Sequence, residues 1–186
     1  MIMPKIVATE EQWIQIGIHR FAQNGTEGLV IEKMAAELGC SKSSFYWYFK
    51  NRQEFLHRIV QEWINMSTSQ VIRTSLETAA AEQQLESLLD QMFSATRKGD
   101  FLFYLRKLAS TDPAYQPVID QMEQKRMDYA EELFRRAGMS DERARQKSVI
   151  LYHYYLGWYE RHKQAEIADE ELQRHIRMLR ELIIEI

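Results

Sequence analysis

The sequence predicts an all-α protein of about nine helices, and three observations support this fold class. Of the 186 residues, 45% are hydrophobic, which is ample for a core. Apolar residues recur at intervals of three and four almost everywhere, as in helices with one buried face, and no run alternates as a half-buried strand would. Glycine and proline, with seven and three residues, are few. One large domain or two small ones would account for this length.

The segment 31–49, IEKMAAELGCSKSSFYWYF, predicts two short helices joined by a tight turn. Met34 and Leu38 lie four residues apart, on one apolar face of the first helix. Gly39 follows that helix at the point where a left-handed residue ends a helix at least cost. Ser41 is a good N-cap for the second helix, because its hydroxyl can accept a bond from a free backbone N–H.

The second helix of this segment has two different sides. Phe45 and Phe49 lie four residues apart and are predicted to pack inward. The opposite side presents two hydroxyls, two large aromatic rings and a cation, from Ser43, Ser44, Tyr46, Trp47 and Lys50. Hydroxyls and lysine suit phosphates and base edges, and aromatic rings can touch sugars or thymine methyl groups. This pattern predicts a helix-turn-helix with one helix in the major groove of DNA. The alternative is that the aromatic residues are ordinary packing residues of a bundle.

The flanking residues extend this pattern to a family. The segment Trp13–Trp63 resembles the N-terminal domain of the tetracycline-repressor (TetR) family of bacterial transcription regulators. The family's first helix ends in a characteristic pattern whose places are taken here by Ile18, Phe21, Ala22 and Gly25. Its turn pattern, Ile-Ala-x-x-Ala-Gly-Val-Ser, is matched by MAAELGCS at 34–41. Its recognition helix is matched by SKSSFYWYFKNR at 41–52.

The resemblance implies a TetR-like fold with two domains. Residues 1–50 would form the helix-turn-helix DNA-binding domain, and residues 51–186 the ligand-binding and dimerisation domain. The positions expected to touch double-stranded operator DNA are Lys42, Ser43, Ser44, Tyr46, Trp47, Tyr48 and Lys50. In the family, the positions of Tyr46 and Lys50 commonly serve phosphates, and we assign Ser43, Ser44 and Trp47 to base edges.

Three positions depart from the family pattern. Val30 stands where the family often has a threonine or serine that caps the second helix, which puts a phosphate contact there in doubt. Ser43 replaces a frequent glycine early in the recognition helix and adds a side chain at the DNA surface. Arg52 replaces a frequent lysine at the start of the fourth helix and keeps the charge.

Charge is consistent with a specific DNA reader rather than a nonspecific coat of nucleic acid. The chain has a net charge of −3, and residues 1–65 hold seven cations and seven carboxylates. Residues 42–58, however, carry four cations against one glutamate. A local basic stripe of this kind suffices if two copies act together, so we expect a dimer that reads two half-sites.

Past Trp63 the helical spacing continues, interrupted by residues that typically begin or end helices. Gly99 and Gly138 are predicted to end helices, and Asp100, Ser140 and Asp169 to begin them. Pro117 suits the first turn of a helix. The predicted helices cover residues 51–76, 83–98, 100–108, 117–137, 140–163 and 169–186.

The last two predicted helices resemble an oligomer interface. Residues 149–159, VILYHYYLGWY, are apolar or aromatic almost all round, so the helix needs neighbours on every side. The final helix carries two apolar stripes, Leu172, Ile176, Leu179 and Ile183 in one, and Met178, Leu182 and Ile186 in the other. We expect a homodimer through a four-helix bundle, in agreement with the family, with both helices buried in one large monomer as the alternative. The expected interface residues are Tyr152, Leu156, Tyr159, Leu172, Ile176, Leu179 and Ile183.

The middle helices are rich in aromatic residues and methionine. In the family, a ligand pocket lies in this helical core, and such side chains suit an apolar or aromatic small-molecule effector. The alternative is an ordinary core. The candidate ligand-binding residues are Trp63, Met66, Phe93, Phe103, Tyr104, Met122, Tyr129 and Tyr155. Effector binding would shift the helix 51–76, change the separation of the recognition helices and release the DNA, so we expect a repressor.

Other functional classes are less well supported. Glu54 and His57 form a Glu-x-x-His pattern, but a di-iron site needs a second copy, which is missing. We therefore expect no enzyme activity, no metal site and no cofactor. A helical adaptor that binds a protein through helix 149–159 is a further alternative, and it would be a stable monomer without affinity for DNA.

Location follows from composition. Cys40 is the single cysteine, so no internal disulfide can form, which suits a reducing cytosol. No apolar run reaches membrane-spanning length. The start, MIMPKIVATEEQW, meets acidic residues too early for a signal peptide. We expect a cytoplasmic protein without membrane contact.

Overall fold

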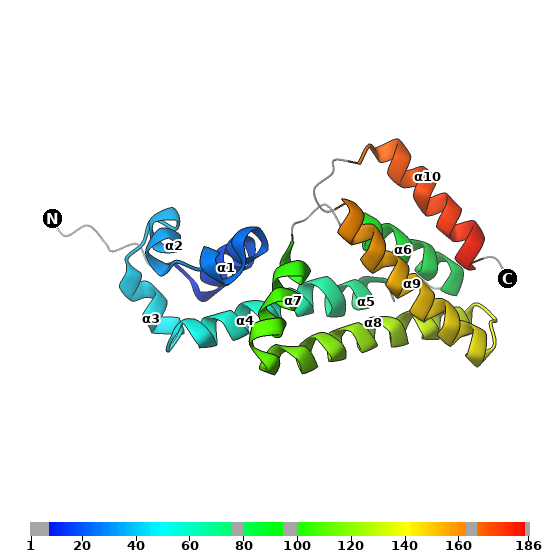
Figure 1. The fold of residues 1–186 in the computed structure, drawn as a ribbon. Helices are drawn as coiled ribbons and strands as arrows, with labels where there is room; N and C mark the ends of the chain where they lie inside the picture. The colour runs from blue at the N-terminus through cyan, green and yellow to red at the C-terminus, as the bar shows by residue number, and fades with distance from the viewer. Residues whose placement is uncertain (1–7, 76–79, 95–99, 163–166, 185–186) are drawn as a thin grey trace. The chain divides into compact units, whose positions relative to one another are not determined.

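The computed structural model describes residues 8–75, 80–94, 100–162 and 167–184. Within these ranges the chain forms helices and no strand (Figure 1), which confirms the predicted all-α fold class. Two compact units are present. The N-terminal unit comprises Met1–Met66 and Asp100–Ile119, and the C-terminal unit comprises Ser67–Gly99 and Asp120–Ile186.

The N-terminal unit begins with a well-capped helix. The hydroxyl of Thr9 accepts a bond from the backbone N–H of Gln12, and the Gln12 side chain accepts one from the backbone N–H of Thr9, which forms a capping box. The helices of this unit are α1 (Glu10–Asn24), α2 (Ile31–Glu37), α3 (Phe45–Tyr48), α4 (Arg52–Ile64) and α7 (Phe101–Thr111). A short 3₁₀ turn at Gly25–Gly28 precedes α2, and another at Lys42–Ser44 precedes α3.

Helix α4 is followed without a break by a π-helical turn and a further α-helix. Asn51 begins α4, because its side-chain oxygen accepts a bond from the backbone N–H of Glu54 at 2.9 Å. A π-helical turn, Asn65–Ser69, joins α4 to α5 (Gln70–Ser75), so the helical run predicted over 51–76 is confirmed as far as Ser75. The sequence pattern did not predict the π turn. It lies where the chain passes from one unit to the other.

Aromatic rings fill the core of the N-terminal unit. Phe45 lies 5.3 Å from Trp13 and 5.1 Å from Phe55, measured between ring centroids. Phe101 of α7 stacks on Trp63 at 4.5 Å, with the two ring planes 10° apart. At Gly17 of α1, any side chain would collide with the ring of Phe55, so the glycine permits the close approach of α1 to α4.

Helix α7 therefore packs with the N-terminal helices, and so does residue range 51–66. The compact units divide the chain differently from the expected domains 1–50 and 51–186. The physical reason is that α4 and α7 supply the rings that close the core beneath α1. A functional division after residue 50 stays a prediction.

The C-terminal unit is a bundle of longer helices. They are α6 (Ala81–Ser94), α8 (Gln116–Arg136), α9 (Asp141–His162) and α10 (Asp169–Leu179), and α10 continues into a π turn, Arg180–Ile184. Residues 116–119 of α8 belong to the N-terminal unit. The core of the C-terminal unit is formed by buried apolar side chains that include Leu85, Leu89, Phe93, Leu133, Phe134, Leu151, Leu172 and Ile176.

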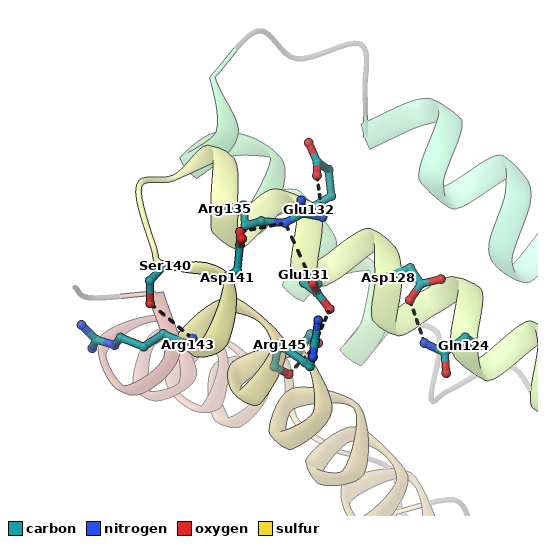
Figure 2. A network of polar contacts seen from close by, with 10 residues as sticks. Gln124, Asp128, Glu131, Glu132, Arg135, Ser140, Asp141, Arg143 and Arg145 are labelled. Atoms are coloured by element: carbon teal, nitrogen blue, oxygen red, sulfur yellow. Dashed lines mark hydrogen bonds and ion pairs between the residues drawn. The ribbon is translucent and has the colours of Figure 1, made fainter.

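A glycine and a set of ion pairs lie at the corner between α8 and α9, and Figure 2 shows the ion pairs. Gly138 has a φ of +97°, a conformation that L side chains rarely adopt, and this ends α8 where predicted. Arg135 near the end of α8 pairs with Glu132 at 3.0 Å and with Asp141 of α9 at 3.9 Å. Arg145 of α9 reaches back to Glu131 at 3.8 Å. The Arg135–Glu132 pair lies within α8, whereas the pairs Arg135–Asp141 and Glu131–Arg145 bridge α8 and α9.

The predicted helix starts are partly as expected. The Ser140 hydroxyl lies 3.5 Å from the backbone N–H of Arg143, so Ser140 caps α9. Asp100 precedes α7 but makes no capping bond with its side chain, and Asp169 is the first residue of α10 rather than its cap. The predicted ends at Leu76, Lys98, Gly99, Lys163 and Ile186 lie outside the described residues.

Candidate nucleic-acid interface

The turn between α2 and α3 depends on one glycine. Gly39 has a φ of +65°, and the N–H of Cys40 donates to the carbonyl of Ala35 at 3.0 Å, which closes the end of α2. The predicted role of Gly39 is confirmed. Ser41 precedes the next turn, but its hydroxyl bonds to that of Ser43 at 2.7 Å instead of capping a backbone N–H, which corrects the expected cap.

The recognition segment, residues 42–50, is anchored from beneath. Phe45 and Phe49 are fully buried, as predicted. Ser44 is also buried, with 1% of its surface exposed. Its hydroxyl accepts a bond from the indole N–H of Trp13 at 3.3 Å and lies 3.3 Å from the carbonyl oxygen of Ala8, to which it donates. Both roles of this hydroxyl are filled inside the unit, so the expected contact of Ser44 with DNA is corrected.

The outer side of the segment carries the other expected residues. Trp47 is 62% exposed and Tyr46 is 51% exposed, whereas ordinary packing residues of a bundle would be largely buried. The remaining members, Lys42, Ser43 and Lys50, are exposed, and Tyr48 is half-buried. We call these six residues the recognition face: Lys42, Ser43, Tyr46, Trp47, Tyr48 and Lys50.

The cations near this face differ in their partners. The ammonium of Lys42 pairs with the carboxylate of Glu32 on α2, which raises the pKa of Lys42 and lowers the pKa of Glu32. The Lys50 ammonium makes no ion pair with any residue that the structure describes. Arg52 donates to the carbonyl of Thr26 inside the unit. Val30 begins α2 without a side-chain capping bond, as its departure from the family pattern implied.

The candidate ligand-binding residues are distributed over both units. In the N-terminal unit, Trp63 stacks on Phe101, and the Tyr104 hydroxyl donates to the carbonyl of Gln23 at 2.8 Å. Met66 and Phe103 are exposed, whereas Phe93 and Met122 are buried in the C-terminal unit. The family resemblance implied one helical core around these residues. The structure places Trp63 and Tyr104 with the core of the N-terminal unit, and Phe93, Tyr129 and Tyr155 with that of the C-terminal unit.

The two tyrosines of this set in the C-terminal unit make polar contacts there. Tyr129 and Ser75 are joined through their hydroxyls. Burial raises the pKa of Tyr155, against the opposing effect of the nearby Arg126 guanidinium. Arg126 also donates to the Thr68 hydroxyl at 2.9 Å, so it connects α8 to the π turn. The sequence pattern of aromatic residues gave no indication of this arginine.

Most residues expected at a dimer interface are buried within a single chain. Tyr152 and Tyr159 of α9 are buried, Leu156 is half-buried, and the α10 stripe Leu172, Ile176, Leu179 and Ile183 belongs to the core of the C-terminal unit. Their own chain covers most of these side chains, and an interface through them stays a prediction. The apolar side chains that remain exposed on these helices are Ile150, Tyr154, Met178 and Leu182, which we call the apolar stripe. Met178 of α10 and Leu182 of the π turn that follows it come from the second stripe of the sequence pattern.

Other kinds of site find no support among the described residues. No group of three or more histidine, cysteine or acidic side chains in the described ranges could hold a metal ion. None of the described helices is long and apolar enough to cross a membrane. A polar cavity of about 290 Å³ lies in the N-terminal unit and is lined by Arg20, Asn24, Glu27, Gly28, Val30 and Lys33, none of which is a candidate ligand residue.

Comparisons with known proteins agree with this geometry. Residues 15–59 match the family model described as bacterial regulatory proteins, tetR family. A search of curated proteins finds no match. Among solved structures, a TetR transcription regulator from Haloarcula marismortui has 18% identity over 94% of this chain and 95% of its own, with a TM-score of 0.76.

Two further structures contain ligands. AibR, solved with isovaleryl coenzyme A and operator DNA, has 17% identity over 90% of this chain and 96% of its own, with a TM-score of 0.67. A transcriptional regulator from Saccharomonospora viridis, solved with choline, has 13% identity over 92% of this chain and 94% of its own, with a TM-score of 0.75. Residues 15–59 thus match the N-terminal domain of the tetR family, and the chain shares the fold of these solved regulators.

Proposed function

We propose that this protein is a sequence-specific DNA-binding transcriptional regulator that acts as a homodimer. The observation that carries the proposal is the recognition face. A tryptophan and a tyrosine that are more than half exposed stand beside lysines and an exposed serine at the end of a helix-turn-helix. Exposure of two large rings is costly in water unless a partner covers them, and DNA accepts each of these side-chain types.

The apolar stripe supports the homodimer. Ile150 and Tyr154 of α9, Met178 of α10 and Leu182 of the π turn that follows α10 present apolar surface, while other side chains of these elements are buried. A side chain at Gly157 of α9 would meet nothing within 4 Å, so a second helix can approach its backbone there. A second copy of the chain is the partner that fits best, because a symmetric pair also places two recognition faces for two half-sites.

Ligand control is the third part of the proposal. AibR binds an acyl coenzyme A together with operator DNA, and the Saccharomonospora regulator binds choline, so this fold accommodates small molecules. We infer an apolar or aromatic effector in the helical core. The helical run from Asn51 to Ser75 leads from the recognition segment into the C-terminal unit.

Effector binding would shift this run and release the DNA, which describes a repressor. An effector must bind the two states with unequal affinity, by about 1–3 kcal/mol, to act in this way. Because its partner is DNA, we place the protein in the cytoplasm. A protein-binding adaptor would also use the apolar stripe, but it would leave the recognition face without a role.

Selection from a pool of random duplexes tests the proposal. Wild-type protein should enrich fragments with two related half-sites in inverted order, about one helical turn or a multiple apart. Repeating the selection with isovaleryl coenzyme A, choline and aromatic acids should identify compounds that reduce recovery. No enrichment over the starting pool would refute DNA recognition, and enrichment that no compound alters would refute ligand control by these classes.

A further inference from the structure

Among the described residues, one carboxylate pairs with a charged side chain of the recognition face, whereas that of Glu54 accepts a bond from the backbone N–H of Lys50 at 2.9 Å. Glu32 is the second residue of α2, and its Oε1 lies 2.5 Å from the Nζ of Lys42, the first residue of the recognition face. Both side chains are more than half exposed, so water reaches the pair from outside. The ion pair therefore joins α2 to the start of the recognition segment, across the turn of the helix-turn-helix. It holds a lysine that the proposed function assigns to DNA.

The other ion pairs of the N-terminal unit lie elsewhere. Arg20 pairs with Glu37 and Arg58 pairs with Glu10, and neither arginine belongs to the recognition face. Lys50, the second lysine of the face, makes no ion pair with a described residue. Within the described part of the chain, Glu32 is thus the carboxylate that pairs with a cationic side chain of the recognition face.

We propose that Glu32 limits the affinity of this protein for the DNA backbone by occupying and neutralising Lys42. The inference rests on the proposed function. A phosphate oxygen bound by Lys42 would lie about 3 Å beyond the ammonium, and so within about 6 Å of the Glu32 carboxylate. At that separation in water, two like unit charges disfavour each other about threefold.

The consequence for DNA binding can be stated in two quantities. A lysine that is already neutralised releases few counterions when it meets a phosphate, so its contribution to salt dependence is small. With Glu32 removed, each Lys42 should contribute its full share, about 0.9 to the slope of log affinity against log salt, or about 1.8 for a dimer. The effect should be the same for every DNA sequence, because phosphates carry no sequence information.

The test uses the full chain and one nonspecific duplex. Affinity is measured by fluorescence anisotropy between about 50 and 200 mM KCl for wild type, Glu32→Gln, Lys42→Met and the double variant. Glu37→Gln is the matched control, because it removes the carboxylate that pairs with Arg20 from the same helix. Glu32→Gln should bind about tenfold more tightly at low salt, which is threefold for each protomer, with a slope steeper by about 1.8.

The control variants separate release of Lys42 from a general gain of positive charge and from a change in stability. Glu37→Gln should stay within twofold of wild type, and the gain from Glu32→Gln should vanish in the Lys42→Met background. Glu32 also lies near the positive end of α2, where a carboxylate stabilises a helix, so thermal melts accompany each variant. Glu32→Asp keeps a charge at that helix end but is too short to hold Lys42 as closely, and it should show a smaller gain.

Two results would overturn the inference while leaving the proposed function intact. One is a Glu32→Gln variant that binds nonspecific DNA as wild type does. The other is a gain that persists without Lys42. A wild-type protein that retains no DNA at low salt would instead refute the proposed function.

Discussion

Trp47 and Leu182 have nearly the same exposure, 62% and 69%, yet they lie in different surroundings. Trp47 belongs to a face with two tyrosines, a serine and two lysines, on a segment anchored by the buried Phe45 and Phe49. Leu182 lies in the π turn after α10, and Leu179 and Ile183, close to it in sequence, belong to the core. Exposure alone therefore does not identify a partner. Neighbouring side chains indicate DNA in the first region and a second protein surface in the other.

The largest effect is expected from the support beneath the recognition face. Phe45 is fully buried and contacts the rings of Trp13, Phe49 and Phe55. Phe45→Ala should lower the free energy of unfolding by about 3–5 kcal/mol, through lost burial and the cavity left behind. Urea denaturation followed by tryptophan fluorescence measures this. A loss below about 1 kcal/mol would show that the segment is not anchored as described.

The next effect concerns the apolar stripe. Leu182→Glu places a charge on both copies of the proposed interface and should raise the dimer dissociation constant about 100-fold or more, measured by analytical ultracentrifugation. The control is Gln173→Glu, which adds a charge at an exposed position on another side of α10. Equal dissociation constants for the two variants would exclude the stripe as the interface.

Removal of Trp47 should act on DNA alone. Trp47→Ala should weaken binding to the selected operator about 10- to 100-fold, within the range for one good base or methyl contact, and should leave the dimer intact. The melting temperature should change little, since most of the side chain is in water. Phe103→Ala removes another exposed ring of the N-terminal unit, outside the recognition face, and operator affinity should survive it. If both variants lose affinity equally, the recognition face is wrongly placed.

The smallest effect is a pH dependence in the C-terminal unit. His175 stacks on Trp158 with ring centroids 3.5 Å apart, and burial, with a contribution from His162, lowers the pKa of His175. The unfolded chain, with a histidine pKa near 6.5, then binds a proton more readily than the folded chain. Stability should therefore fall as pH drops from about 7 to about 5.

His175→Phe keeps a stacking ring without the proton and should reduce this pH dependence. Urea denaturation of both proteins at several pH values measures the difference. Parallel curves for the two proteins would show that His175 does not titrate between the two states.

The sequence predicted the helices and the anchor of the recognition face, because these depend on local spacing. Phe45 and Phe49 and the left-handed Gly39 follow from such rules. The prediction that Ser44 faces outward is wrong because it assumes α-helical geometry. Residues 42–44 form a 3₁₀ turn, in which each residue rotates further about the helix axis than in an α-helix. The burial of Ser44 also depends on Trp13 and Ala8, more than thirty residues away.

The spacing of apolar residues could not predict how the helices pack against one another. The sequence showed two apolar stripes on the last helix, but spacing cannot tell which one meets its own chain, and the structure buries Leu172 and Ile176 and exposes Met178 and Leu182. The packing of α7 with the N-terminal helices depends on Phe101 meeting Phe21 and Trp63, which are far away in sequence. The π turn at 65–69 has no residue signature of its own.

Amide hydrogen exchange of the wild-type chain, with and without a selected operator, tests the central claim most directly. Added operator should slow exchange at residues 42–50 and leave 150–154 and 178–182 unchanged, while dilution toward monomer should speed exchange at the latter two ranges only. Protection by DNA at the apolar stripe, with none in the recognition segment, would contradict the account.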